Sequence, residues 1–238
     1  MRPVLILQHL AGDGPAYLAT WLARRGIPAD VRCSERGEAF PADIGGYRAL
    51  AVLGGAMSAN DPLPGLRDAE RLILQAMSAD RPVIGHCLGG QLMARALGAR
   101  IAASPAPEIG WLPVDWAAEA GAWFGPALAD PEPPRVFHWH FEAFALPPQA
   151  QALGGSPACP HQAFAIGPHL AMQFHVELDE EKLHRWAREP EDSYAPAHAA
   201  HPATVQSADA MLADAARRLA AQQRLADAAY GRWIAAAG

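Results

Sequence analysis

The sequence has few basic residues and no run of them. Its 238 residues include 19 lysines and arginines against 25 aspartates and glutamates, for a formal net charge of −6. Nucleic-acid-binding domains concentrate positive charge on one face or in one segment. The missing basic run therefore predicts a protein that does not bind nucleic acid.

Long apolar runs are also missing, although hydrophobic residues make up 51% of the chain. Charges, glycines or prolines interrupt every apolar stretch before the roughly 20 residues that a membrane span requires. The apolar start of the chain, residues 1–8, is too short for a signal peptide and runs directly into a strand pattern. We expect no contact with a membrane and a cytoplasmic location.

Cysteine is scarce. Cys33, Cys87 and Cys159 are odd in number and lie far apart in the chain. Disulfide frameworks pair an even number of cysteines and persist in oxidising compartments. The cysteine pattern therefore favours a reducing cytoplasm, and we expect Cys33 and Cys159 to be buried as small apolar residues.

Short apolar segments alternate with longer amphipathic ones through the first hundred residues. The pattern predicts strands at residues 4–8, 27–33, 49–53 and 82–86, and helices at residues 16–25, 66–79 and 88–97. Strands separated by helices of this length form parallel βαβ units with right-handed crossovers. The prediction is an α/β protein with an open, mostly parallel, twisted sheet flanked by helices.

The pattern changes after residue 100, where short strands and Gly/Pro turns predominate. We expect a more antiparallel half of the same sheet, with strands at residues 111–116, 135–140, 162–166 and 170–174. Further along, the pattern predicts a helix at residues 179–188, an irregular connection at residues 189–202, and one or two packing helices at residues 208–237.

The segment Gly85-His86-Cys87-Leu88-Gly89 lies where a predicted strand turns into a helix. It has the G-x-nucleophile-x-G form of a nucleophile elbow, with Cys in place of Ser. The positive end of the helix favours the thiolate, and the amide of Leu88 would point toward a developing oxyanion. We expect Cys87 to be a nucleophile.

A thiolate nucleophile needs a proton carrier and a group that orients the carrier. His175 and Glu177 follow the predicted strand at residues 170–174, and on an extended chain they would project to the same side. We expect His175 to carry the proton and Glu177 to hold its tautomer. An alternative takes the histidine beside the nucleophile, His86, as the base; the placement of His175 and Glu177 disfavours it.

Two further segments are candidates for the site. Gly54-Gly55 follows the third predicted strand directly, at the sheet edge where open α/β sheets bind ligands. A Gly-Gly turn can aim a backbone N–H into the pocket, so Gly55 is the expected second oxyanion donor. His138 and His140 have a spacing found in zinc sites, but no compelling third and fourth ligands accompany them. We therefore expect no metal ion and no cofactor, with one of these histidines lining the cleft.

Together, Val83-Ile84-Gly85-His86-Cys87-Leu88-Gly89-Gly90-Gln91, Gly54-Gly55 and Gln173-Phe174-His175-Val176-Glu177 resemble class I glutamine amidotransferases in order and spacing. Within that family the chain is most similar to stand-alone proteins related to the amidotransferase domain of GMP synthase, through Glu108-Ile109-Gly110-Trp111 and the segment at residues 158–164. The resemblance covers roughly residues 1–180.

The resemblance implies a flavodoxin-like open α/β fold and a Cys-His-Glu triad at Cys87, His175 and Glu177. It implies oxyanion donors at Gly55 and Leu88, and a substrate-holding side chain at Gln91. The family attacks the side-chain amide of glutamine and releases ammonia from a γ-glutamyl thioester. We expect residues 1–188 to be the catalytic domain and residues 189–238 a C-terminal helical extension packed on it.

Five residues depart from the family pattern. Val176 replaces Pro, Ala56 replaces Pro, and His86 stands where an apolar residue is common. Phe141-Glu142 replaces Gly-Asp close to the region that recognises the amino-acid end of glutamine. His140 and Glu142 are therefore candidate substrate-binding residues, and a γ-glutamyl compound other than glutamine is an alternative substrate.

Three functions remain open. The first is hydrolysis of the γ-amide of glutamine or of a γ-glutamyl conjugate. The second is an ammonia-donating glutaminase subunit with a separate synthetase partner, because only about 60 residues follow Glu177 and they contain no phosphate-binding loop. The third is a regulatory or binding protein of the same fold without turnover, which the intact triad disfavours.

Overall fold

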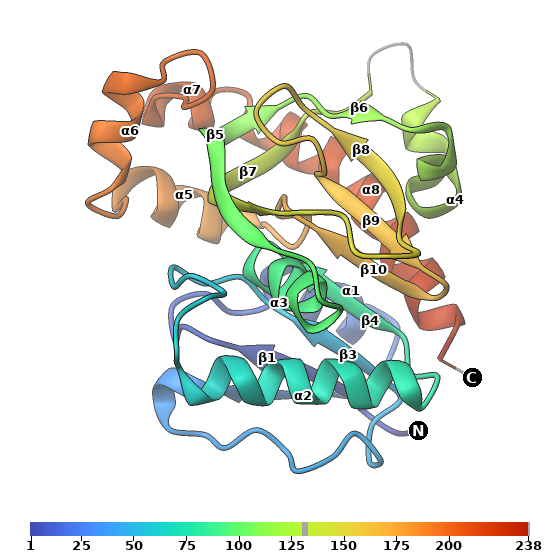
Figure 1. Cartoon of the computed structure of the whole chain (residues 1–238). Helices are drawn as coiled ribbons and strands as arrows, with labels where there is room; N and C mark the ends of the chain where they lie inside the picture. Colours follow the sequence, from blue (N-terminus) through green and yellow to red (C-terminus); the bar gives the residue numbers. More distant parts are fainter. Residues whose placement is uncertain (130–132, 238) are drawn as a thin grey trace.

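The computed structural model describes residues 1–129 and 133–237. Its centre, in the described residues, is an eight-stranded sheet (Figure 1). In spatial order the strands are β2 (Ala29–Cys33), β1 (Val4–Gln8), β3 (Ala49–Val52), β4 (Val83–His86), β10 (His169–Met172), β9 (Ala163–Ile166), β8 (Gln151–Gly155) and β6 (Asp115–Trp116).

The first five strands in this order pair in parallel, and the pairs β10–β9, β9–β8 and β8–β6 are antiparallel. The order β2-β1-β3-β4-β10 is that of flavodoxin-like sheets, in which ligands bind beyond the carboxyl ends of the strands. The predicted α/β fold with an open, mostly parallel sheet is therefore confirmed.

Helices cover both faces of the sheet, because its central strands are apolar on both sides. In β1, Val4 and Ile6 pack with α1 (Ala16–Arg24) and α8 (Ala215–Ala235). Leu5 and Leu7 pack on the opposite face. That face is covered by α2 (Pro64–Ser78) and α3 (Leu88–Ala96), which lie in front of the sheet in Figure 1.

A separate two-stranded antiparallel ribbon consists of β5 (Ile101–Leu112) and β7 (Val136–Phe144). The prediction that residues 111–116 and 135–140 continue the main sheet is therefore wrong for most of these residues; of them, Asp115 and Trp116 join it, through β8. Strand patterns show which residues are extended and do not specify the partner strand. The ribbon packs its apolar side against the C-terminal helices instead.

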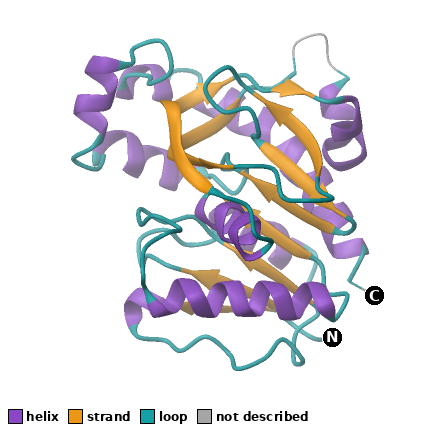
Figure 2. Cartoon of the chain, viewed as in Figure 1, coloured by secondary structure: helices purple, strands orange, loops and turns teal. Residues whose placement is uncertain are grey.

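Short helices fill the connections (Figure 2). Residues 189–202, predicted to be irregular, contain α6 (Tyr194–Ala200). Its Pro196 lies in the first turn, where the missing N–H of proline breaks no hydrogen bond because these groups have no acceptor within the helix. The remaining helices are η1 (Ser34–Arg36), η2 (Ala118–Ala120), α4 (Gly121–Phe124), η3 (Gly125–Leu128), α5 (Glu180–Arg188) and α7 (Ala208–Leu212). Across the described residues, no helix has both the length and the apolar character that crossing a membrane requires.

Candidate active site

Cys87 occupies a strained backbone position between β4 and α3. Its φ of +48° and ψ of −108° lie in a region that non-glycine residues rarely adopt. Glycines on either side make the turn possible: a Cβ on Gly89 would lie 2.1 Å from the carbonyl oxygen of Val52, and one on Gly85 would lie 2.6 Å from the backbone of Gly89. The side chain is nearly buried, at 6% exposure.

Two groups hold the thiol of Cys87. Its Sγ lies 3.6 Å from the carbonyl oxygen of Trp139, and Gln173 Nε2 donates to Sγ at 3.5 Å. These two contacts fix the position of the sulfur. Gln173 was not among the predicted site residues. It lies two residues before His175, within the segment Gln173-Phe174-His175-Val176-Glu177, and this position could have identified it.

His175 and Glu177 lie together beside Cys87. Nδ1 of His175 is 2.7 Å from Oε1 of Glu177, and both side chains are buried. A carboxylate only accepts, so Nδ1 carries the proton and Nε2 is the atom left for the thiol. The extended-chain premise of the prediction is wrong. Strand β10 ends at Met172, and the pair meets across a turn closed by a hydrogen bond from Leu178 N to His175 O at 3.3 Å.

The charges of this group support one another. Burial alone would lower the pKa of His175, but Glu177 and Cys87 raise this pKa to about 10. Burial would likewise raise the pKa of Glu177, but His175, His86 and Lys182 hold this pKa well below its usual range. Lys182 Nζ is 3.6 Å from Glu177 Oε1 and is itself buried. The arrangement stabilises an imidazolium beside an ionised carboxylate.

His86 lies on the other side of β4. Its Nε2 is 3.1 Å from the hydroxyl of Tyr230 on α8, and burial lowers its pKa to about 4. No described interaction joins His86 to the sulfur of Cys87. The contacts of His86 therefore favour His175 over His86 as the base for Cys87.

The predicted oxyanion donors are adjacent. A Cβ on Gly55 would lie 2.9 Å from Leu88 Cδ2, which shows how closely the two segments approach each other. Leu88 is the first residue of α3, where backbone N–H groups have no helical acceptor. Gly55 also lines both cavities that open at Cys87.

The predicted substrate-binding residues line one of these cavities, whose volume is about 230 Å³. Gln91 Nε2 donates to the carbonyl oxygen of Glu142 at 2.9 Å. Ser58 Oγ donates to the Glu142 carboxylate at 2.7 Å. His140 lines the same cavity, and its Nε2 lies 3.2 Å from Glu108 Oε2. The structure thus brings Gln91, His140 and Glu142 together beside Cys87.

A second, narrower cavity of about 50 Å³ opens on the other side of the thiol. Trp139 and Trp186 form walls of this cavity, and acidic residues that the sequence analysis did not single out also line it. The residues that line it are Asp13, Gly55, Cys87, Trp139, His175, Trp186, Glu189, Pro190 and Glu191.

Glu108, His140 and Cys159 place possible metal-ligating atoms within 4.8 Å of one another, and all three residues are buried. These atoms already have other partners. Ser156 Oγ and Gln162 Nε2 donate to Glu108, at 2.8 and 2.6 Å. The thiol of Cys159 donates to the carbonyl oxygen of His161 at 3.4 Å, and burial and the Glu108 charge raise the pKa of this thiol to about 12. The contacts are those of a buried hydrogen-bond network, and the absence of a metal stays a prediction.

Like Cys159, Cys33 is buried, as predicted.

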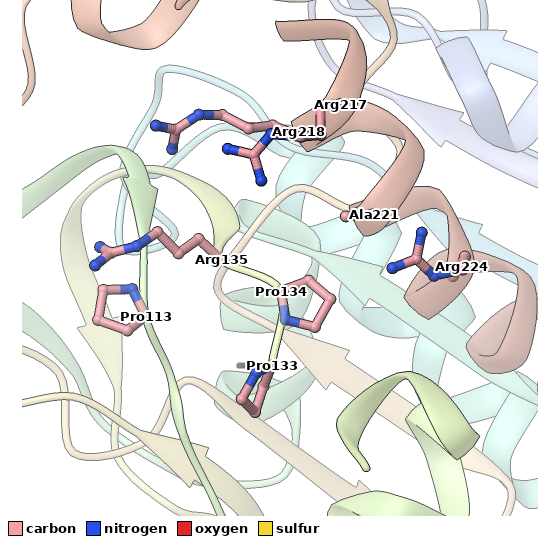
Figure 3. A pocket seen from close by; sticks show the side chains of 8 residues that line it. All are labelled: Pro113, Pro133, Pro134, Arg135, Arg217, Arg218, Ala221 and Arg224. Atoms are coloured by element: carbon pink, nitrogen blue, oxygen red, sulfur yellow. The ribbon is translucent and has the colours of Figure 1, made fainter. Parts of the chain in front are cut away.

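A cavity of about 510 Å³ lies elsewhere, between the start of β7 and α8 (Figure 3). None of the predicted site residues is among the described residues that line it. These are Pro113, Pro133, Pro134, Arg135, Arg217, Arg218, Ala221 and Arg224.

Residues 21–185 match the sequence profile of the family described as glutamine amidotransferase class-I. The chain belongs to this family. The predicted resemblance is therefore confirmed, and the matched segment includes Cys87, His175 and Glu177.

Curated relatives agree with this assignment. The glutamine amidotransferase-like protein YfeJ of Salmonella typhimurium is 35% identical over 196 residues, which cover 76% of this chain and 79% of YfeJ. GMP synthase of Thermomicrobium roseum is 32% identical over 175 residues, which cover 70% of this chain but 31% of that enzyme.

Among solved structures, a glutamine amidotransferase from Methylobacillus flagellatus is 36% identical, with a TM-score of 0.91. The match covers 99% of this chain and 95% of that one. A glutamine amidotransferase from Thermotoga maritima, at 24% identity and a TM-score of 0.83, shows the same fold.

Proposed function

We propose that the protein hydrolyses the γ-amide of glutamine or of a γ-glutamyl compound through a γ-glutamyl thioester on Cys87. The observation that carries the proposal is the placement of Cys87 on a glycine-framed elbow beside the buried His175–Glu177 pair. Membership of the class I glutamine amidotransferase family supports the same reaction.

In the first half-reaction the Cys87 thiolate attacks the γ-carbonyl carbon and a C–S bond forms. Negative charge moves to the carbonyl oxygen, where the backbone N–H groups of Gly55 and Leu88 would receive it. His175, protonated at both nitrogens, gives the Nε2 proton to the leaving nitrogen, and the C–N bond breaks. Ammonia or an amine leaves, and the γ-glutamyl group remains on sulfur.

In the second half-reaction water attacks the thioester carbon and His175 takes the water proton. The C–S bond then breaks and releases glutamate from Cys87. Glu177 fixes the proton on Nδ1 of His175 and stabilises the imidazolium at both stages, because its buried carboxylate has that ring as its nearest charge partner at 2.7 Å.

The test is glutamate release from glutamine and from a panel of γ-glutamyl amides. We expect turnover in the wild type and its loss, by at least about a thousandfold, in Cys87→Ala and His175→Ala. Cys33→Ala is the matched control, since this buried thiol lies outside the site, and it should retain turnover. A covalent γ-glutamyl adduct should appear by mass spectrometry on Cys87. Unchanged turnover in His175→Ala would contradict the triad.

A second candidate is an ammonia-donating subunit that acts with a separate synthetase. The relative from Thermomicrobium roseum is a GMP synthase, of which this chain spans about a third. A synthetase that copurifies with the chain and raises glutaminase activity on mixing would support this candidate. Full hydrolytic activity of the purified chain alone, with no stimulation, would count against it. The cytoplasmic location rests on the cysteine usage and on the missing signal-peptide pattern, and it remains a prediction.

A further inference from the structure

The cavity between the start of β7 and α8 is lined by arginines from two separate elements (Figure 3). Arg135 immediately precedes β7, whereas Arg217, Arg218 and Arg224 belong to α8. The volume of about 510 Å³ lies in the range of small-molecule sites. Within residues 1–129 and 133–237, no aspartate or glutamate lines this space, which we call the arginine cavity.

Guanidinium groups at one end of the arginine cavity repel each other. Figure 3 shows Arg217 and Arg218 extending from α8 toward Arg135. Burial and the charges of Arg217 and Arg135 lower the pKa of Arg218, and the charge of Asp214 offsets part of this effect. The chain as a whole carries a net charge of −6, so its composition does not account for a cluster of positive charge.

Donors of these arginines are available to a ligand. Nε of Arg218 is buried and, among the described residues, has no hydrogen-bond partner. Arg217 pairs with Asp214 at 3.3 Å, but these side chains are 76% and 65% exposed, and exposed pairs contribute little. A buried donor without an acceptor costs free energy, and an anion in the cavity that Arg218 lines would supply the acceptor.

The walls favour one class of anion. Guanidinium groups form paired hydrogen bonds with phosphate and carboxylate oxygens. Here they come from two elements, so a single planar carboxylate would face only some of them, whereas linked tetrahedral phosphates present oxygens in several directions. Pro113, Pro133 and Pro134 form another part of the wall and have no backbone N–H to offer. The arginine side chains therefore supply the donors.

We propose that the arginine cavity binds an oligophosphate, whose oxygens accept hydrogen bonds from Arg135 and Arg218. A free oligophosphate and the phosphate chain of a nucleotide share this chemistry. None of the described residues that line the arginine cavity lines the two cavities at Cys87. The proposal is therefore independent of the proposed hydrolase function.

A bound oligophosphate would join β7 to α8. Gln222 already links these elements, because its Oε1 accepts from the N–H of Phe137 at 2.7 Å. Arg135 lies two residues before Phe137, and Arg218 lies about one helical turn before Gln222. The ligand thus adds a second link at the same junction, and its binding should stabilise the folded protein.

Sodium tripolyphosphate is the probe, added at a constant ionic strength of about 0.15 M and with EDTA present. These conditions keep salt screening constant and prevent metal chelation from causing a change. We expect saturable one-to-one binding by calorimetry and a Tm that rises with ligand concentration, because a ligand of the folded state stabilises it by mass action. Citrate, a polycarboxylate, should bind more weakly. Absence of saturable binding, or equally tight binding of citrate, would overturn the proposal.

Single variants locate the site. Arg135→Gln and Arg218→Gln should each raise the Kd of tripolyphosphate by about fivefold, the upper range for exposed ion pairs. Arg218→Gln also removes repulsion, so the Tm of the ligand-free protein should stay the same or rise, and weaker binding will not reflect unfolding. Arg100→Gln is the matched control, since Arg100 is exposed and does not line the arginine cavity. An equal increase of Kd in Arg100→Gln would show that binding follows net charge, and the assignment to the cavity would be wrong.

Adenosine triphosphate and adenosine distinguish the two sources of the phosphates. Tighter binding of adenosine triphosphate than of tripolyphosphate, weakened in Arg135→Gln, would identify a nucleotide. Binding of tripolyphosphate that is as tight or tighter would identify a free oligophosphate. Adenosine has no phosphate and should not bind in either case. Adenosine that binds as tightly as adenosine triphosphate, with a Kd unchanged in Arg135→Gln, would contradict recognition of phosphate by the arginines.

Discussion

Gln222 on α8 holds the backbone of His175. Its Nε2 donates to the carbonyl oxygen of His175 at 3.0 Å, and its Oε1 accepts from the N–H of Phe137 at 2.7 Å. Gln222 is fully buried. Gln222 therefore links two segments: the turn that contains His175, the predicted base, and strand β7. We propose on this basis that residues 189–238 form a helical extension that supports the site of the catalytic domain, residues 1–188.

Replacing Gln222 tests this support. Gln222→Leu keeps the size of the side chain but leaves the buried N–H of Phe137 unpaired, and of its described hydrogen bonds the carbonyl oxygen of His175 keeps only the one from Leu178 N. We expect a loss of about 2 kcal/mol or more in the free energy of unfolding, measured in urea, together with a lower kcat. Gln223→Leu, at a partly buried neighbouring position, is the control and should change both far less. Equal effects of the two substitutions would show that Gln222 has no special role.

The elbow glycines give a second prediction. A Cβ on Gly89 would lie 2.1 Å from the carbonyl oxygen of Val52, so Gly89→Ala must displace α3 from β3. We expect a destabilisation of about 3 kcal/mol, or failure to fold, and a loss of activity in any folded fraction. Gly46→Ala has no atom within 4 Å of the new Cβ and should be as stable as the wild type within about 1 kcal/mol. An active Gly89→Ala with unchanged stability would contradict the geometry of the elbow.

Local patterns predict the strands and helices that build the parallel half of the sheet. Strand β1 begins and ends where the apolar run predicts, because every residue from Val4 to Gln8 is buried between two helical layers. Cys87 could likewise be found from its neighbours, since the strained turn needs glycines close by in the sequence. Which strands pair with each other could not be predicted in this way. The pattern of β5 and β7 shows two strands, and nothing in it reveals that they pair with each other outside the main sheet.

Residues that act across long separations are the ones that the sequence could not reveal. Gln222 lies 47 residues from His175, and its amide has no local signature on an alanine-rich helix. Asp13, Glu189 and Glu191 resemble ordinary surface acids until the fold brings them to one cavity. An extended chain predicts that His175 and Glu177 lie on one side; the structure brings them together across a turn instead, because residues two apart can meet in either geometry.

The free energy of unfolding should depend on pH through His169. Val83 N donates to its Nδ1 at 3.1 Å, which requires an unprotonated ring nitrogen, and burial lowers the pKa of His169 to about 4. A depressed folded-state pKa favours the neutral ring, so this contribution is present above about pH 6.5 and is lost as the pH falls toward 4.

The corresponding experiment compares urea unfolding at pH 7.5 and pH 5. His169 alone should contribute about 2 kcal/mol to the decrease in the wild type. His169→Gln removes the titrating ring and should reduce the decrease by about that amount, at the cost of a lower stability at pH 7.5. His184→Gln, a control at a position 35% exposed, should leave the decrease unchanged. An equal decrease in wild type and His169→Gln would show that His169 does not contribute.

Lys182 is a buried cation beside Glu177. Its ammonium lies 3.6 Å from Glu177 Oε1 and donates to the carbonyl oxygen of Gly14 at 3.1 Å. The charge of Lys182 is one of the causes that lower the pKa of Glu177, so its removal raises that pKa. A depressed carboxyl pKa keeps Glu177 ionised as the pH falls, and Glu177 in turn keeps His175 correctly protonated. In Lys182→Met we therefore expect the acid limb of the pH profile of kcat/KM to move to higher pH.

The loss in Lys182→Met should grow as the pH falls below about 5, toward the ordinary pKa of a glutamate, and should be small at pH 6 and above, where Glu177 stays ionised. Lys182→Arg keeps the charge and should restore the position of the acid limb even if its packing lowers kcat. The control matters because Lys182 also packs near Trp186, with the ammonium 5.1 Å from the ring centroid. A uniform loss of activity at all pH values in both variants would identify a packing role, and the electrostatic link from Lys182 through Glu177 to His175 would then be wrong.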